Sequence, residues 1–295
     1  MQSQKRADAF SECNFPALAE CSAMAHVARR CALLYLVLLG FSSGAAGKVA
    51  AAEAEHGRVE AALNLYTVPK IEMLFEQLTA LQPIYFDRLW RNLPDRPPQE
   101  RPRLALLTGA VIANGFLVVA TEKSNRVEPV GRALLRFAKA LGIGERLNRR
   151  SRHIIEQAQA EHWTEVRNEL KNTQHEAALA MLALRDEELV HLVALGGWLR
   201  GLEITSTAVA DDYSAERSRV LIQPELAQYF LDHLAHLSPR THNSPLIQLI
   251  EKDLRDVDDV VEPGLIGGRL KRLGLGDVKR LKELAKHMND AITEE

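Results

Sequence analysis

The stretch LALLTGAVIANGFLVVA, Leu104 to Ala120, is the most apolar part of the chain beyond residue 54. Its 17 residues would rise about 26 Å as a helix, slightly less than the roughly 30 Å core of a bilayer. Asn114 in its middle would be costly in lipid, whereas a helix that is apolar on all sides suits the centre of a bundle. We therefore expect a buried central helix, with a membrane span as the alternative.

The rest of the chain beyond residue 54 has a helical composition, dominated by Leu, Ala, Glu, Arg and Lys, and alternating β-branched runs are scarce. The sequence predicts an all-α, single-domain bundle of about eight helices over residues 55–295. A Pro-rich linker is expected at 93–102, and residues 55–66 are expected to be loosely ordered. The other expected helices are 69–92 with a kink at Pro83, 127–141, 145–160, 164–184, 186–212, 224–237, 245–261 and 277–292.

Three glycines interrupt the expected helix 186–212, at Gly196, Gly197 and Gly201. Each costs about 1 kcal/mol relative to alanine in a helix, so a compensating contact is needed. One interpretation is close approach of another helix backbone, for which Gly109 and Gly115 in the central apolar helix are the expected partners.

The alternative interpretation is a ligand lying against the glycine cluster. Trp198 could stack on such a ligand and Arg200 could bind its anionic group, with Asn114 nearby on the central helix. Glu203 lies three residues after Arg200, so these two could also simply pair along the helix. Packing is favoured over ligand binding. The ligand hypothesis names Asn114, Trp198, Arg200 and Glu203.

Metal chemistry has one weak sequence candidate. Glu188 and His191 form Glu-x-x-His on one helix face, but di-iron bundles need two such motifs plus further carboxylates, and no second copy is found on an expected helix. The acidic run from Asp253 to Glu262 lacks the loop order of a calcium site. No Walker loop, nucleophile elbow, dinucleotide fingerprint or His-Glu-x-x-His motif occurs. We expect no bound metal or cofactor and lean away from an enzyme.

An export signal is indicated near the N-terminus. Arg29 and Arg30 precede an apolar run from Cys31 to Phe41, and two Ala-x-Ala sites end at Ala52 and Ala54, the order of a secretory signal peptide. We expect residues 24–54 to be this signal, with cleavage after Ala52 or Ala54. Residues 1–23 are expected to be a mis-assigned start, translation beginning at Met24. Because no cysteine follows the apolar run, the pattern is not that of a lipoprotein.

The predicted mature chain has no cysteine, since Cys13, Cys21 and Cys31 all precede residue 54. Disulfides, thiolate nucleophiles and iron–sulfur clusters are thereby excluded for it. It carries 32 basic and 35 acidic residues. This near-neutral balance gives no electrostatic argument for nucleic acid or anionic lipid as a partner. Membrane association is possible but not favoured.

A short internal similarity links AKALGIGERLNRR (138–150) with LKRLGLGDVKRLK (270–282). Each reads as a helix end, a Leu-Gly-[Ile/Leu]-Gly turn and a new helix, and the turn resembles the glycine turn of helix-hairpin-helix DNA-binding motifs. We interpret both as ordinary helix caps.

Taken together, the sequence predicts an exported, periplasm-like helical protein that is non-enzymatic, either ligand-binding or an envelope structural or interaction protein. Its expected partner is an unknown small molecule or an envelope protein. The alternatives are a metal-dependent carboxylate/His enzyme and an inner-membrane protein anchored by residues 104–120.

Overall fold

The computed structural model describes residues 71–170, 172–173, 186–262, 265–266, 269–270 and 272–294. The chain divides into two units, Met1–Arg58 and Val59–Glu295, and every described residue belongs to the second. The predicted signal peptide, the expected start at Met24 and the segment 55–66 all lie outside the described residues.

The second unit is an all-α bundle, which confirms the predicted fold class. A two-stranded hairpin is its one addition within the described ranges. The elements are α3 (Ile71–Ala80), α4 (Phe86–Leu89), α5 (Arg101–Ala120), α6 (Ser124–Leu141), α7 (Gly144–Gln159), α9 (Glu187–Asp211), the 3-10 helix η1 (Arg217–Leu221), α10 (Pro224–Ala235), α11 (Pro239–His242), α12 (Pro245–Val261), β1 (Leu265–Ile266), β2 (Arg269–Leu270) and α13 (Leu275–Thr293). Residues 163–170 and 172–173 are also helical, and the rest of the expected helix to 184 lies outside the described residues.

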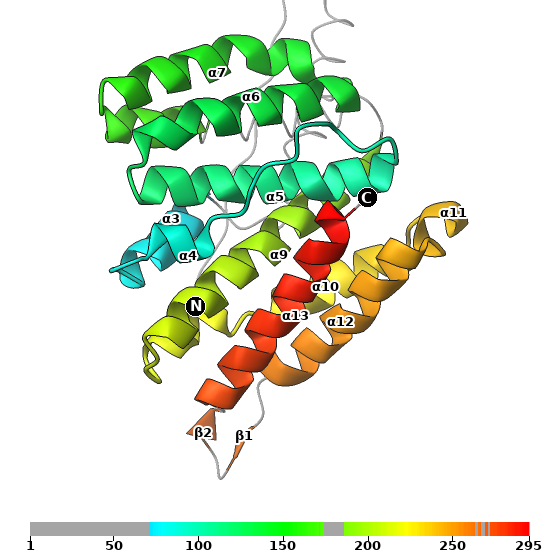
Figure 1. Ribbon diagram of the computed structural model, residues 1–295. Coiled ribbons are helices and arrows are strands. Elements are labelled where there is room, and N and C mark those ends of the chain that lie inside the picture. Colours follow the sequence, from blue (N-terminus) through cyan, green and yellow to red (C-terminus); the bar gives the residue numbers. More distant parts are fainter. Residues whose placement is uncertain are drawn as a thin grey trace, which may run out of the picture. The chain divides into compact units, whose positions relative to one another are not determined.

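Helix α5 is the central apolar helix that its sequence predicts. It packs against α6 on one side and against α9 and α13 on the other, with α7 forming a further layer outside α6 (Figure 1). In the described part of the chain, α5 alone is long and apolar enough to cross a membrane, and 78% of its apolar window is buried inside the protein. This burial favours a core helix over a membrane span.

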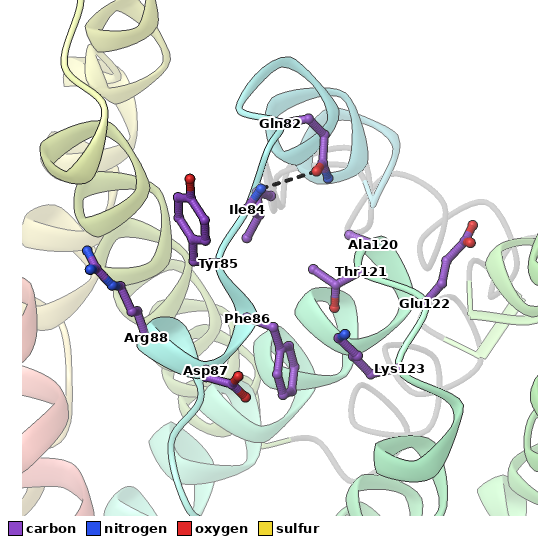
Figure 2. A pocket seen from close by; sticks show the side chains of 10 residues that line it. All are labelled: Gln82, Ile84, Tyr85, Phe86, Asp87, Arg88, Ala120, Thr121, Glu122 and Lys123. Atoms are coloured by element: carbon purple, nitrogen blue, oxygen red, sulfur yellow. Dashed lines mark hydrogen bonds between the residues drawn. The ribbon is translucent and has the colours of Figure 1, made fainter.

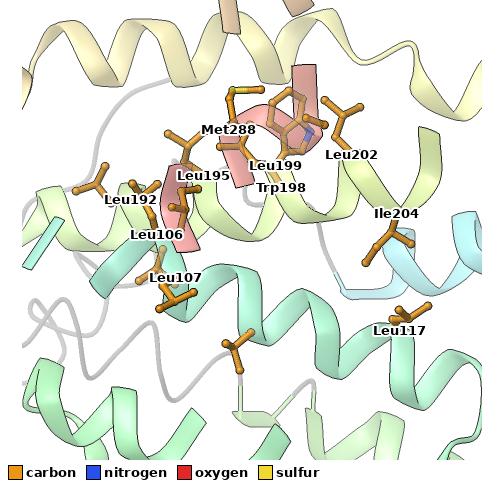
Figure 3. Packing of buried hydrophobic residues seen from close by; sticks show 14 of the residues in the cluster. Leu106, Leu107, Leu117, Leu192, Leu195, Trp198, Leu199, Leu202, Ile204 and Met288 are labelled. Carbon is orange, nitrogen blue, oxygen red and sulfur yellow. The ribbon is translucent and has the colours of Figure 1, made fainter. Parts of the chain in front are cut away.

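The core lies mainly between α5 and α9, which share the most extensive helix–helix contact of the bundle. Leu106 and Leu117 of α5 and Leu199 of α9 are fully buried, and Met288 of α13 closes the same cluster (Figure 3). Both α5 and α9 bury residues on all sides rather than along one stripe. The other helices therefore form layers around this pair.

The single helix expected over 69–92 is wrong. Helix α3 ends at Ala80 and the chain re-enters a helix only for the short α4. Pro83 has no backbone N–H to continue the ladder and restricts the residue before it. The side chain of Gln82 instead accepts a hydrogen bond from the backbone of Ile84 at 3.2 Å. Residues 81–85 therefore form a non-helical connection between α3 and α4, and not a kink within one continuous helix.

The two similar glycine turns have different structures. Gly142 ends α6 in the left-handed region with φ of 91°, and α7 begins two residues later, so this turn is the expected helix cap. The second turn is preceded by the β1–β2 hairpin, in which Leu265 pairs with Leu270, and not by a helix. There, Gly274 caps the start of α13, its backbone N–H donating to Asp277 at 2.9 Å.

Candidate functional site

Helices α5 and α9 touch backbone to backbone at two glycines. A Cβ atom added to Gly196 would lie 1.9 Å from the carbonyl oxygen of Leu106, and one added to Gly109 would lie 1.9 Å from that of Val193. Real Cβ atoms do not approach other atoms this closely, so only glycine fits at either position. This contact offsets the helix cost of the two glycines.

The other glycines of the cluster are less constrained. A Cβ on Gly197 would lie 3.4 Å from the carbonyl oxygen of Gly109, and one on Gly115 would lie 3.5 Å from a methyl group of Val130 on α6. Gly201 lines a small pocket beside Trp198. The helix crossing is therefore centred on Gly109 and Gly196.

Arg200, the proposed anion-binding residue, is buried with 1% of its surface exposed. Its Nε donates to Oδ1 of Asn114 at 2.9 Å, and its Nη1 donates to Oε2 of Glu203 at 2.8 Å. Its Nη2 donates to the backbone carbonyl of Leu89. All three guanidinium nitrogens thus bind groups of the protein itself, as a buried charge requires.

Glu203 is shared between two arginines. Arg91, from the segment before α5, donates to it from Nε at 2.9 Å and from Nη2 at 2.7 Å, and Arg91 also donates to Asp290 of α13 at 2.8 Å. The network therefore joins four separate parts of the chain. We refer to Arg91, Asn114, Arg200, Glu203 and Asp290, with the Leu89 carbonyl, as the arginine network.

Burial lowers the pKa of Arg200 to about 10, an effect that the negative charge of Glu203 opposes. The guanidinium therefore remains charged at neutral pH, and its charge is balanced inside the protein. The side chains of Asn114, Arg200 and Glu203 thus make hydrogen bonds within the bundle.

Trp198 is also held within the protein. It is 7% exposed, and its indole Nε1 donates to the side chain of Gln223 at 3.2 Å. The pocket beside it, which Gly201 and Thr205 also line, has a volume of about 20 Å³. That is room for a water molecule and far below the size of an organic-ligand site.

Glu188 and His191, the metal candidates of the sequence, have separate partners. The carboxylate of Glu188 accepts hydrogen bonds from the backbone of Ser238 at 2.6 Å and from the hydroxyl of Thr241 at 3.2 Å. Among the described residues, no three His, Cys, Asp or Glu side chains converge closely enough to hold a metal ion.

His191 instead belongs to an aromatic cluster between α9 and α10. Its ring centroid is 3.8 Å from that of His233, and its Nδ1 is 3.0 Å from the hydroxyl of Tyr229. His233 directs its own Nδ1 to the backbone carbonyl of Tyr229 at 2.7 Å, a bond that requires a proton on that nitrogen. The two imidazole rings therefore lie against each other, both within hydrogen-bonding distance of Tyr229.

Burial, helped by the proximity of His233, lowers the pKa of His191 from 6.5 to about 4. Because the unfolded chain takes up this proton at a higher pH than the folded protein, the stabilisation is present above pH 6.5 and is lost as the pH falls toward 4. The free energy of unfolding, measured in urea, should therefore fall between pH 7 and pH 5.

The His191→Phe variant should show a shallower fall in unfolding free energy over this range, since it cannot gain a proton at this position. His153→Gln, at a half-exposed histidine, is the matched control and should follow the wild type. Parallel pH profiles for wild type and His191→Phe would contradict the assignment.

A larger, open pocket of about 610 Å³ lies between residues 82–88 and the α5–α6 turn (Figure 2). Tyr85 at its edge is 59% exposed, and Lys123 lies 5.9 Å from the ring centroid of Phe86. Arg88 pairs with Asp211 at 3.2 Å and Glu122 with Arg167 at 3.3 Å. The size suits a small organic molecule, but the charges are balanced and select no class of ligand.

Sequence patterns missed Arg91, Asp290 and Tyr229. Arg91 binds Glu203 from 112 residues away and Asp290 from 199 residues away, and no local spacing signals such partners. Tyr229 and His233 are four residues apart on α10, a spacing that could have indicated a shared face. No family model, curated protein or solved structure matches the chain.

Proposed function

We propose that this chain is an exported helical protein with a structural or interaction role in the cell envelope, without enzymatic activity. The export part rests on the leader: a basic pair, an apolar run from Cys31 to Phe41, and Ala-x-Ala sites ending at Ala52 and Ala54. This order supports export of the rest of the chain to a periplasm-like space.

The interaction role rests on the arginine network. Arg200 and Glu203 carry charges in the core of the bundle. Besides pairing with each other, Arg200 binds Asn114 of α5 and the Leu89 carbonyl of α4, and Glu203 binds Arg91 from the chain before α5. Hydrogen bonds of this kind set the relative positions of the helices. A partner would then have to be recognised by the outer surface of the protein. This observation supports a surface-acting protein over a binder that encloses a small molecule near Trp198.

Export is tested by expressing the full chain in a Gram-negative host and following it with an antibody. We expect osmotic shock to release a shortened protein whose first residue, by N-terminal sequencing, is Glu53 or Glu55. In the control, Leu36→Arg with Leu38→Arg, the apolar run is interrupted, and the uncleaved chain should stay in the cell.

If cells that express the unaltered chain keep it at full length in the cytoplasm, the export proposal is wrong. A chain that stays with the membrane pellet after shock would instead favour the membrane-anchored alternative.

A further inference from the structure

The near-neutral net charge conceals a strong local imbalance. Residues 123–153, which cover α6, the glycine turn and the first part of α7, contain nine Lys and Arg but only two Asp and Glu. The rest of the predicted mature chain contains 23 basic and 33 acidic residues. This segment of 31 residues therefore carries a net charge of +7 in a chain that is otherwise acidic.

The structure places this segment in an outer layer. Helix α6 buries Val130, Ala133 and Phe137 toward the core, and Gly131 faces Ile155 of α7. Its remaining face is exposed and carries Arg132, Arg136 and Lys139 at helical spacing. On α7, Arg152 and His153 are exposed. We refer to Arg132, Arg136, Lys139 and Arg152 as the basic face.

Acidic side chains neutralise little of the basic face. Arg132 pairs with Glu128 one turn earlier, and both are well exposed. Within the described part of the chain, the guanidinium of Arg136 has one long polar contact, 3.5 Å, to the backbone carbonyl of Pro94. No described carboxylate lies within ion-pair distance of Lys139 or Arg152. Such exposed, uncompensated cations create a positive potential that favours an anionic partner.

We propose that the basic face binds the surface of an anionic lipid bilayer. The inference rests on the proposed function, since export brings the chain to a membrane. Clustered Lys and Arg are attracted to anionic head groups without any apolar insertion. The face offers no exposed aromatic ring for stacking on bases, because Phe137 is buried and no other Phe, Trp or Tyr occurs in 123–153. A lipid surface therefore fits better than single-stranded nucleic acid.

The test is sedimentation of the purified full chain with vesicles of phosphatidylglycerol and phosphatidylcholine, compared with phosphatidylcholine alone. Apolar binding by the leader occurs with both vesicle types, so the difference reports electrostatic binding. We expect preferential binding to the anionic vesicles that is lost between about 0.05 and about 0.5 M salt as the Debye length shrinks.

The variant Arg136→Glu, Lys139→Glu, Arg152→Glu should reduce binding to anionic vesicles at least tenfold. The control Arg240→Glu, Lys252→Glu, Lys279→Glu makes the same charge change at exposed positions elsewhere and should bind within about twofold of the wild type. Circular dichroism and thermal melting establish that both variants fold. Because the leader is common to all three proteins, its own charges cancel from the comparison.

Equal binding by the two triple variants would overturn the proposal, as would wild-type binding that does not depend on anionic lipid. Retention of duplex DNA in a gel-shift assay without vesicle binding would assign the basic face to nucleic acid and would also overturn it. The export experiment is independent. If the leader fails to direct export while the vesicle result holds, the proposed function is wrong and the basic face still binds anionic bilayers.

Discussion

The Gly196→Ala variant is expected to lose at least about 3 kcal/mol of unfolding free energy. Its new methyl group would lie 1.9 Å from the carbonyl oxygen of Leu106, and relief requires separating the two central helices. Overpacking in a core usually costs about 1–3 kcal/mol. The cost at Gly196 should reach or exceed the top of this range, because the methyl group would clash with backbone atoms, which cannot rotate away as a side chain can. For a domain of this size, the loss corresponds to a fall in Tm of about 6–12 °C.

Gly109→Ala should give a similar loss, since its methyl group would meet the carbonyl oxygen of Val193 at 1.9 Å. Gly115→Ala is the matched control on the same helix. Its methyl group would make an ordinary contact of 3.5 Å with Val130, and alanine's helix propensity should leave stability unchanged or raise it by up to about 1 kcal/mol. Thermal and urea unfolding measure all three. Equal stability of the Gly196 and Gly115 variants would contradict the close helix crossing.

Arg200→Ala is expected to cost about 3–5 kcal/mol, because it leaves the amide oxygen of Asn114 and the carbonyl of Leu89 without their donor in the core. It also removes one of the two arginines that bind the carboxylate of Glu203. Arg200→Met restores much of the lost volume but none of the hydrogen bonds. It should fall between the alanine variant and the wild type in urea unfolding.

Arg88→Ala is the control for a salt bridge at the surface. Arg88 is 66% exposed and pairs with Asp211 at 3.2 Å, so its loss should cost less than about 1 kcal/mol. If Arg200→Met and Arg88→Ala were equally stable, Arg200 would not carry the internal role that its contacts indicate.

Local patterns were enough to predict the helical class and the burial of α5. An uninterrupted apolar run with one amide can be recognised without knowing its neighbours. The unfavourable glycines of α9 likewise require a compensating contact, and the structure places Gly196 against α5. The break after Ala80 was missed because a proline inside a periodic pattern is compatible with a kink as well as with a turn.

The candidate site could not be predicted in the same way. The pattern around Trp198 and Arg200 is compatible with a ligand as well as with packing. The choice depends on the Leu89 carbonyl, at the end of the short helix α4, and on Arg91 in the irregular segment that follows it. Similarly, the net charge of the chain gave no sign of the basic face, because acidic residues elsewhere offset its positive charge.

The contact between α5 and α9 also limits how the sequence can change over evolution. Gly109 and Asn114 are five residues apart on α5, and Gly196 and Arg200 are four apart on α9. On each helix, one position therefore accepts only glycine, Gly109 on α5 and Gly196 on α9. Each helix also carries one polar side chain, Asn114 or Arg200, that hydrogen-bonds to the other. A homologue that keeps this crossing should retain Gly-x4-Asn in an uncharged apolar helix together with Gly-x3-Arg in a later one. This paired signature would identify distant relatives after most surface positions have diverged.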